Sequence, residues 1–519
     1  MFNVTQVAAY QRSDGESQLP FSHIKTFTKE RTFRPPEILT QIPKVAMQNE
    51  KLSPIVKPFT EDLFKKQEIN DSHIKAKAAD NAFVFCRQDM DNRQGWTEFN
   101  QQDNHNCSTK TAISYMPMIL NPAHEYDTIN LVVRRCMVIS SHFKQEHTVI
   151  TVDQQLFCKL HILISNTPEF QNKVFPRLGG LHISLNYQKI IGKHMSDCGL
   201  YEAWIESSLL GEVAAQKVLA GKSYSKAMRA HKITIQVLWR MIIPKFMDFL
   251  SHENSDMAKL MNDEIKKYKD GNKNYADLMS LLQTNEWREY LSTFVKQESD
   301  KSVNFSFWWK YMEMISILLM FTRAQRDGNW ELYLLSFRQM IPFYFQYDHQ
   351  NYARWSIIYL AQMIQIPEQI REEFMKGDFV VKCSELKFTQ VDPDHAQEWL
   401  NRASKIAGGI IGITNTTSAL MNWNLTFNAR SFIANQTYDM FDLKMDKQVA
   451  KETTNARKGR DKTDEDKLFE TLSNFKVFTI STNNLINIAT NDVATAEIQE
   501  SLITAKENGE KLMLEFVKG

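Results

Sequence analysis

The sequence predicts a mixed α/β core that is interrupted by a large all-helical insertion and followed by a helical C-terminal region. Three observations predict this fold class. Short β-branched runs alternate with segments of helical spacing between about residues 81 and 199. Long amphipathic segments without a strand pattern fill residues 200–380. A strand-like run and an acid-bearing helical segment then follow at 387–406.

The composition excludes several classes of protein. The 519 residues include 62 basic and 61 acidic side chains and are 43% hydrophobic, so the chain can bury a large core in two or three domains. Its near-zero net charge argues against a strongly basic nucleic-acid coat, although a local basic groove is compatible with it. The six cysteines form no CxxC pair, which argues against a zinc module and a disulfide framework and favours a reducing compartment.

The chain is also expected to be intracellular and not embedded in a membrane. Its first residues lack the charged-then-apolar layout of a signal peptide. The longest apolar run, at 315–321, is far shorter than a bilayer span.

The first part of the chain is predicted as an arm followed by alternating elements. Residues 1–80 are polar, carry several prolines and show no sustained period, which predicts an extended polar arm that could include one short helix. Residues 81–199 are predicted to be the first part of the core. Strands are expected at 82–86, 111–119, 147–153 and 175–183, and helices at 128–143, 154–164 and 184–195.

The rest of the chain is predicted to be mainly helical. Residues 200–380 are the all-helical insertion. Residues 381–440 complete the core, with a strand at 387–392 (KFTQVD) and a helix at 393–406. Residues 441–519 are expected to be a charged linker and C-terminal helices.

Two residues at element ends are candidates for chemistry. Asp153 ends the predicted strand 147–153, and acids at such ends converge on the functional edge of an α/β sheet. Asp153 could equally cap the helix that begins at Gln154. His182 ends the next predicted strand beside Gly179 and Gly180, which allow close backbone approach, and it could equally be a hydrogen-bonded structural residue.

The order of the predicted elements is that of a ribonuclease-H-like fold interrupted by an insertion. In such folds two strand-end aspartates and one helix-borne glutamate hold two divalent ions that cleave a phosphodiester. Carboxylate ligands suit Mg²⁺ or Mn²⁺. In PDHAQEWLN, Asp394 and Glu398 are four positions apart and therefore lie on one helix face.

Several motifs resemble those of a large family of transposon-derived proteins, multiplied in cnidarians, molluscs and arthropods and related to a fungal domain of unknown function. They are ITVDQQLFCKL, RLGGLHISLNYQKIIGK, GKSYSKAMRAHK, DHQNYARW, and DHAQEWLN followed by GGIIGIT. They occur in this order between about residues 80 and 440. The segment from the VTVD strand to GGLH and the following Asn also resembles the middle of the Mutator-like DDE transposase core.

This resemblance implies roles for individual residues. Asp153 corresponds to the second metal-binding acid and Glu398 to the third, with Asp394 matching an acid one turn earlier. His182 and Asn186 match an HxxxN pattern. The transposase pattern has a cysteine where this chain has Gly179, so no Cys/His zinc site is expected. His182 is left with a structural or DNA-positioning role.

The first metal-binding acid is the least defined. The resemblance places it near residues 83–96, where Asp89 or Asp91 could serve. These two residues could also belong to a plain surface turn. In that case the metal site would be incomplete and the protein a catalytically dead relative.

Basic residues supply candidate contacts to DNA. Lys226, Arg229 and Lys232 lie on the first turns of a long predicted helix, and Arg354 lies in the NYARW motif. An ordinary solvated helix face explains the first three equally well. RKGR at 457–460 is a weak nuclear-localisation pattern and is more often a charged surface.

The sequence thus yields one enzymatic expectation and two alternatives. The resemblance implies cleavage and transfer of DNA strands at element ends by a nuclear enzyme that uses Mg²⁺ or Mn²⁺, with a homodimer as one compatible state. The first alternative is a catalytically inactive, domesticated protein that binds DNA or protein. The second is a plain interaction scaffold.

Overall fold

The computed structural model divides into two compact units, each built from three stretches of the chain. Unit 1 comprises residues 1–58, 106–183 and 365–447, and unit 2 comprises 59–105, 184–364 and 448–519. The structure describes residues 7–11, 62–65, 70–87, 94–102, 110–116, 119, 121–270, 275–382, 384, 386–405, 416, 418–419, 422–423, 426, 452–478 and 483–518.

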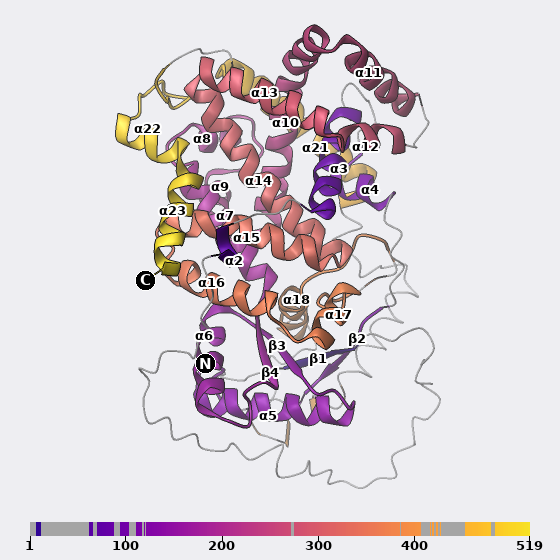
Figure 1. Ribbon diagram of the computed structural model, residues 1–519, viewed down its shortest axis with the longest axis vertical. Coiled ribbons are helices and arrows are strands. Elements are labelled where there is room, and N and C mark those ends of the chain that lie inside the picture. Colours follow the sequence, from indigo (N-terminus) through magenta and orange to yellow (C-terminus); the bar gives the residue numbers. More distant parts are fainter. Residues whose placement is uncertain are drawn as a thin grey trace. The chain divides into compact units, whose positions relative to one another are not determined.

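Unit 1 contains a small parallel β-α-β unit. Strand β3 (Thr148–Val152) pairs in parallel with β4 (Val174–Leu178), and helix α6 (Gln154–Asn166) connects them. A parallel pair needs such a crossover because its strands run in the same direction. Helix α5 (Tyr126–His142) packs against β3 and α6, and in Figure 1 it crosses beneath the two strands. The buried core between these elements is Ile129, Val133, Ile150, Leu160, Leu163, Phe170 and Val174.

The remaining elements of unit 1 come from both ends of its sequence. Strand β1 (Ala8–Gln11) pairs antiparallel with β2 (Ala112–Tyr115). Helices α17 (Glu368–Met375) and α18 (Pro393–Lys405) follow later in the chain. An isolated bridge joins Val381 to Val391 between these two helices.

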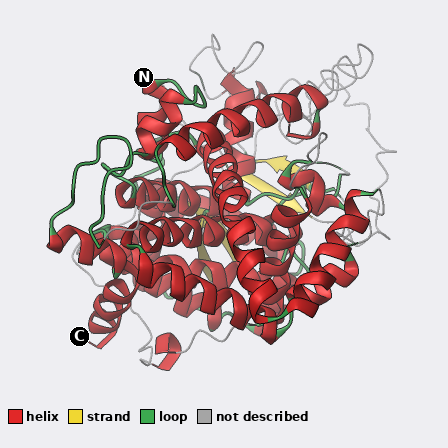
Figure 2. Ribbon diagram, turned by 90° about the horizontal axis from the view of Figure 1, so that it is seen from above, coloured by secondary structure: helices red, strands yellow, loops and turns green. Residues whose placement is uncertain are grey.

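The expected ribonuclease-H-like mixed sheet core is wrong. Within the described residues, the strands form two separate two-stranded sheets, β1 with β2 and β3 with β4. Most of the described chain is helical, as Figure 2 shows. The element order that suggested a larger sheet included strands at three short runs, 82–86, 175–183 and 387–392, of which the first is helical and the other two are strands only in part.

The first of these runs is helical. Residues 82–86 (AFVFC) are the last turns of α3 (Asp71–Cys86), which begins where the Asn70 side chain accepts a hydrogen bond from the backbone N–H of His73. A run of five apolar residues has no periodicity that separates a strand from a buried helix end. The alanine-rich residues before it extend the helix to Cys86.

The other two runs are strands only in part. The strand predicted at 175–183 ends at Leu178, and α7 (Gly180–His194) starts two residues later, so His182 lies in the first turn of a helix. The strand predicted at 387–392 is reduced to the single bridge at Val391. The boundary between the two units falls within α7, after Ile183.

The described residues of unit 2 are mainly helical, with one isolated bridge that joins Ile486 to Val493. Apart from α3 and the end of α7, its helices are α2 (Asp62–Lys65), α4 (Trp96–Gln101), α8 (Leu200–Glu206), α9 (Glu212–Leu219), α10 (Tyr224–Glu253), α11 (Ser255–Lys269), α12 (Ala276–Leu282), α13 (Asn285–Lys301), α14 (Val303–Asp327), α15 (Trp330–Gln346), α16 (Gln350–Ile364), α21 (Asn455–Asn474), α22 (Ala496–Ile503) and α23 (Ala505–Lys518). Of the residues predicted as the all-helical insertion, 200–380, those up to 364 belong to this unit and those from 365 belong to unit 1.

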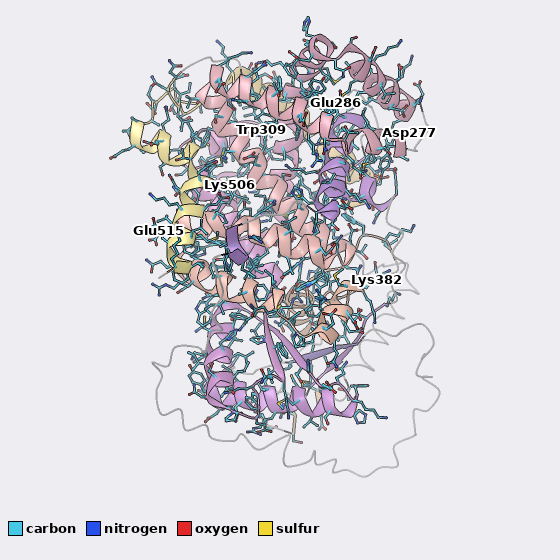
Figure 3. The ribbon with its side chains drawn as sticks, viewed as in Figure 1. Asp277, Glu286, Trp309, Lys382, Lys506 and Glu515 are labelled. Atoms are coloured by element: carbon cyan, nitrogen blue, oxygen red, sulfur yellow. The ribbon has the colours of Figure 1, made fainter. Side chains whose placement is uncertain are left out.

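Helix α14 is the centre of this unit. Buried residues lie on all its sides, which is typical of a helix that is surrounded by others. It packs against α13 and α15, and α23 packs on α15. The outer helices carry the charged residues, as Figure 3 shows for Asp277 on α12, Glu286 on α13 and Glu515 on α23. None of the described helices is long and apolar enough to span a membrane.

Candidate functional site

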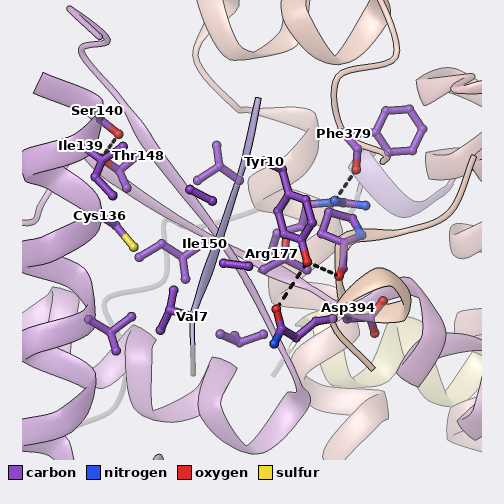
Figure 4. Close-up of a pocket in the computed structure, with 18 of the residues that line it drawn as sticks. Val7, Tyr10, Cys136, Ile139, Ser140, Thr148, Ile150, Arg177, Phe379 and Asp394 are labelled. Atoms are coloured by element: carbon purple, nitrogen blue, oxygen red, sulfur yellow. Dashed lines mark hydrogen bonds between the residues drawn. The ribbon is translucent and has the colours of Figure 1, made fainter. Parts of the chain in front are cut away.

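Unit 1 contains a cavity of about 1480 Å³. Its walls come from β1, α5, β3, the start of α7 and the segment from α17 to α18. Figure 4 shows mainly apolar side chains at one end and mainly polar side chains at the other. The labelled residues at the first end are Val7, Cys136, Ile139 and Ile150, with the hydrogen-bonded Ser140 and Thr148, and those at the second end are Tyr10, Arg177, Asp394 and Phe379. The cavity therefore offers both an apolar surface and a charged one.

The lining of this cavity is acidic. The lining contains seven carboxylates but only two lysine or arginine side chains, Lys144 and Arg177. The carboxylates belong to Glu146, Asp153, Glu372, Glu373, Asp378, Asp394 and Glu398. This excess of negative charge favours cationic ligands and disfavours a polyanion that binds alone.

A pair of side chains, His182 and Asp394, forms the centre of the polar end. His182 Nδ1 lies 3.0 Å from Asp394 Oδ2. The same carboxylate accepts the backbone N–H groups of Leu181 at 3.0 Å and of His182 at 3.1 Å. These N–H groups belong to the first turn of α7, where the amides have no partner within the helix, so a carboxylate is stabilised there.

Gly179 makes this arrangement possible. A Cβ atom at Gly179 would overlap the Asp394 carboxylate. The Gly residues before His182 indicated a close approach, and the structure shows that the approaching group is the side chain of Asp394.

The electrostatics of the pair favour a charged histidine. The hydrogen bond with Asp394 raises the pKa of His182, burial opposes this rise, and the charges of Asp394, Asp153 and Glu398 add to it. For Asp394, burial alone would raise the pKa, but the hydrogen bond and charge of His182 and the amide of Leu181 lower it below its ordinary value. Asp394 is therefore ionised beside a histidine that holds its proton more strongly than usual.

A second buried carboxyl lies behind this pair. Asp392 is fully buried and forms an ion pair with Arg177, whose Nη1 donates to the carbonyl oxygen of Phe379 at 2.7 Å. Burial raises the pKa of Asp392 to about 7, with Arg177 opposing the rise and Asp394 adding to it. Neither Arg177 nor Asp392 stood out in the sequence, because a buried ion pair between distant segments has no local pattern.

Asp153 and Glu398 complete the acidic group. Asp153 Oδ1 accepts the N–H of Leu156 at 2.9 Å, so Asp153 is the N-cap of α6, as the alternative interpretation of the sequence proposed. It also lines the cavity. Glu398 lies one turn after Asp394 on α18, is exposed and lines the same cavity. The structure thus brings Asp153, His182, Asp394 and Glu398 to one place from three separate segments.

The other residues singled out in the sequence lie elsewhere. Asn186 is in the part of α7 that belongs to unit 2, where its Oδ1 contacts His349 Nε2 at 2.8 Å. Asp89 and Asp91 fall outside the described residues. Among the residues that are described, no group of three or more His, Cys, Asp and Glu side chains could hold a metal ion.

Two of the four residues expected to contact DNA, Arg229 and Lys232, instead contact other residues of unit 2. Arg229 forms ion pairs with Asp461 at 2.7 Å and with Asp464, both on α21. Lys232 lies 4.6 Å from the centre of the Trp96 ring and 3.6 Å from Glu452. Burial lowers the pKa of Lys232 to about 8, with Glu452 opposing this change.

The other two, Lys226 and Arg354, are exposed. A continuous basic face on α10 is therefore not formed, because the acidic residues of α21 cover part of it. The opposite charges of 223–232 and 461–466 were visible in the sequence, but nothing in either segment showed that they meet.

Replacing Asp394 with Asn is expected to lower the pKa of His182, because the substitution removes the opposite charge while it keeps a hydrogen-bond acceptor. An NMR titration of the His182 imidazole measures this change. Glu169→Gln is the control, since Glu169 is exposed and pairs with Arg134 outside the cavity lining. An unchanged His182 pKa in Asp394→Asn would show that the pair does not interact as described.

Comparison with known proteins places the chain in a family. No curated protein and no solved structure matches it. One family model matches residues 95–519, which is more than half of the chain and includes the cavity residues from Asp153 to Glu398. The chain therefore belongs to the family described as domain of unknown function DUF8702.

Proposed function

We propose that unit 1 carries a hydrolytic site for phosphodiesters that uses one divalent cation and His182 as its proton-transfer group. The observation that supports this proposal is the meeting of Asp153, His182, Asp394 and Glu398 in one cavity. The substrate class comes from the resemblance to transposon-derived proteins. A DNA substrate, strand transfer and a nuclear location are parts of the same proposal.

The residues fit one divalent cation better than the two of a DDE site. Asp394 is unsuited as a ligand because its oxygens already accept three N–H groups. Asp153 uses Oδ1 for its cap, and Glu398 makes no hydrogen bond or ion pair with other described residues. Mg²⁺ commonly binds through one or two carboxylates and keeps several waters, so Asp153 and Glu398 would hold one ion.

A bound cation would supply positive charge that offsets the acidic lining and stabilises a phosphate. The chain's own contribution is proton transfer. Asp394 fixes the imidazole of His182 through Nδ1, so exchange with a ligand takes place at Nε2. Because its pKa is raised, His182 is suited to protonate a leaving oxygen near neutral pH.

The proposal predicts cleavage of labelled DNA by the full chain with Mn²⁺ or Mg²⁺ and none with EDTA. Asp153→Asn and Glu398→Gln should each abolish detectable Mn²⁺ binding in electron paramagnetic resonance. His182→Asn should slow cleavage by about 100-fold or more.

Two comparisons between variants distinguish a role of these residues in cleavage from a purely structural role. Asn caps helices about as well as Asp, so Asp153→Asn keeps the cap of α6 while it removes the charge. Its melting temperature should match that of the unchanged protein, whereas Asp153→Ala should be less stable. Glu169→Gln should cleave normally. The proposal fails if the chain binds no Mn²⁺, or if Glu398→Gln cleaves as fast as the unchanged protein.

A further inference from the structure

Strand β3 has one edge that none of the described strands covers. The N–H of Thr148 donates to the carbonyl oxygen of Lys173 at 2.7 Å, and the N–H of Gly179 donates to that of Val152 at 2.9 Å. In a parallel ladder, this register directs residues 148, 150 and 152 toward β4 and leaves the backbone of Val149 and Thr151 facing the opposite edge. Within the described part of the chain, the backbone N–H and C=O groups of Val149 and Thr151 have no backbone hydrogen-bond partner.

The two edges of this small sheet differ in their protection against further pairing. On β4, Pro176 faces the outer edge and has no N–H to donate. The outer edge of β3, in the sequence TVITV, carries no proline, lysine or bulge, which are the usual devices against strand addition. The side chain of Val149 is also 37% exposed. The β3 edge is therefore suited to accept another strand.

This edge borders the cavity of unit 1. All five residues of β3 line it, together with residues 7–10 and the apolar side chains of α5. Val7, Cys136 and Ile139 line the cavity with Ile150 of β3, and Figure 4 labels all four. An extended chain placed here would meet unpaired backbone groups and an apolar wall at the same time.

The charges that line the cavity define the chemistry of the occupant. The lining carries seven carboxylates against Lys144 and Arg177, and Arg177 is already paired with Asp392. We propose that the free edge of β3 binds an extended segment of a partner protein in which apolar residues alternate with Lys or Arg. Strand addition supplies affinity through the backbone, and alternate side chains supply specificity. This inference goes beyond the hydrolytic site and does not depend on it.

Fluorescence anisotropy of the full chain with synthetic peptides tests the proposal, in EDTA so that no cation takes part. The probe is a peptide in which Lys and Thr alternate with Val, and its matched control has Glu in place of Lys. The basic peptide should bind at least about tenfold more tightly than the acidic one. Hydrogen exchange at the amides of Val149 and Thr151 should slow when it binds.

Two substitutions of Thr151 separate the contribution of its backbone N–H to binding from that of its side chain. Thr151→Pro removes the edge-facing N–H without touching the ladder to β4, and Thr151→Val keeps that N–H with a side chain of similar size. Binding should weaken about tenfold or more in Thr151→Pro and stay unchanged in Thr151→Val. Should Thr151→Pro fail to fold, Val149→Lys is the second variant, because a lysine at the edge opposes both strand addition and a basic peptide.

Three results would overturn the proposal. The first is equal binding of the basic and acidic peptides, or of either peptide to Thr151→Pro and Thr151→Val. The second is no binding of the basic peptide at about 1 mM. The third is sedimentation that shows a dimer for the unchanged chain and a monomer for Thr151→Pro, because the edge would then join two copies of this chain.

Discussion

His194 and His231, which are buried in the uncharged form, are expected to lower the free energy of unfolding of unit 2 by about 4 kcal/mol between neutral pH and about pH 5. His73 and His349 add to this loss, because burial lowers the pKa of each to about 4. His194 is fully buried, with Nδ1 2.5 Å from the Tyr347 hydroxyl and its ring stacked on Phe307. His231 is 2% exposed, with Nδ1 2.9 Å from the Tyr311 hydroxyl. Burial lowers the pKa of each to about 3.

The sign of the effect follows from proton binding. An unfolded histidine has a pKa near 6.5, so below that pH the unfolded chain binds protons that the folded chain does not bind. Stability is therefore complete above pH 6.5 and decreases as the pH falls from about 6.5 toward 3. Each pKa unit corresponds to 1.36 kcal/mol, so at pH 5 each histidine removes about 2 kcal/mol. Two such losses are a large fraction of the 5–15 kcal/mol typical of folded proteins.

Urea unfolding at about pH 7.5 and about pH 5 measures this difference. His231→Gln should be less stable at neutral pH but should lose less stability on acidification, because glutamine does not titrate. His252→Gln is the control, since His252 is exposed on α10. Equal unfolding free energies at the two pH values would contradict the buried, uncharged state of both histidines.

The sequence predicted the elements whose signals are local. The β-branched run TVITV is β3, the acid after it caps α6, and the amphipathic spacing of 393–406 matches α18 to within one residue. Each of these depends on neighbours within one or two turns. The runs at 82–86 and 387–392 are of similar length to β3, but their conformation depends on distant contacts, so they were misassigned as strands. The ribonuclease-H-like interpretation failed with them.

The residues of the candidate site also divide into those with a local sequence signal and those that depend on distant partners. Gly179 and His182 stood out because a glycine pair before a histidine is a local signal. The partner of His182 did not stand out, since the sequence analysis grouped Asp394 with Glu398, and the structure shows its carboxylate 3.0 Å from His182 Nδ1. Arg229 and Lys232 were expected on a basic surface, whereas acidic residues more than 200 positions later pair with them. Charge alone does not show which partner a side chain has.

Alanine in place of Gly179 is expected to lower the pKa of His182 to its ordinary range and to destabilise unit 1 by about 1–3 kcal/mol. The added Cβ would occupy the position of the Asp394 carboxylate, which is held by the first turn of α7 and cannot move without losing its N–H donors. NMR titration of His182 and thermal unfolding measure the two effects. Gly459→Ala is the control, because nothing lies within 4 Å of a Cβ there and alanine in a helix interior should stabilise by up to about 1 kcal/mol.

A double-mutant cycle shows whether the cost of Gly179→Ala comes from Asp394. Asp394→Ala removes the carboxylate that the new methyl group meets, so Gly179→Ala should cost much less stability in that background than in the unchanged protein. Residues in contact commonly show coupling energies of about 0.5–3 kcal/mol, and this pair should lie in the upper part of that range. If the two costs simply add, the strain arises elsewhere. The close approach of Gly179 to Asp394 would then not be what places His182 in the cavity.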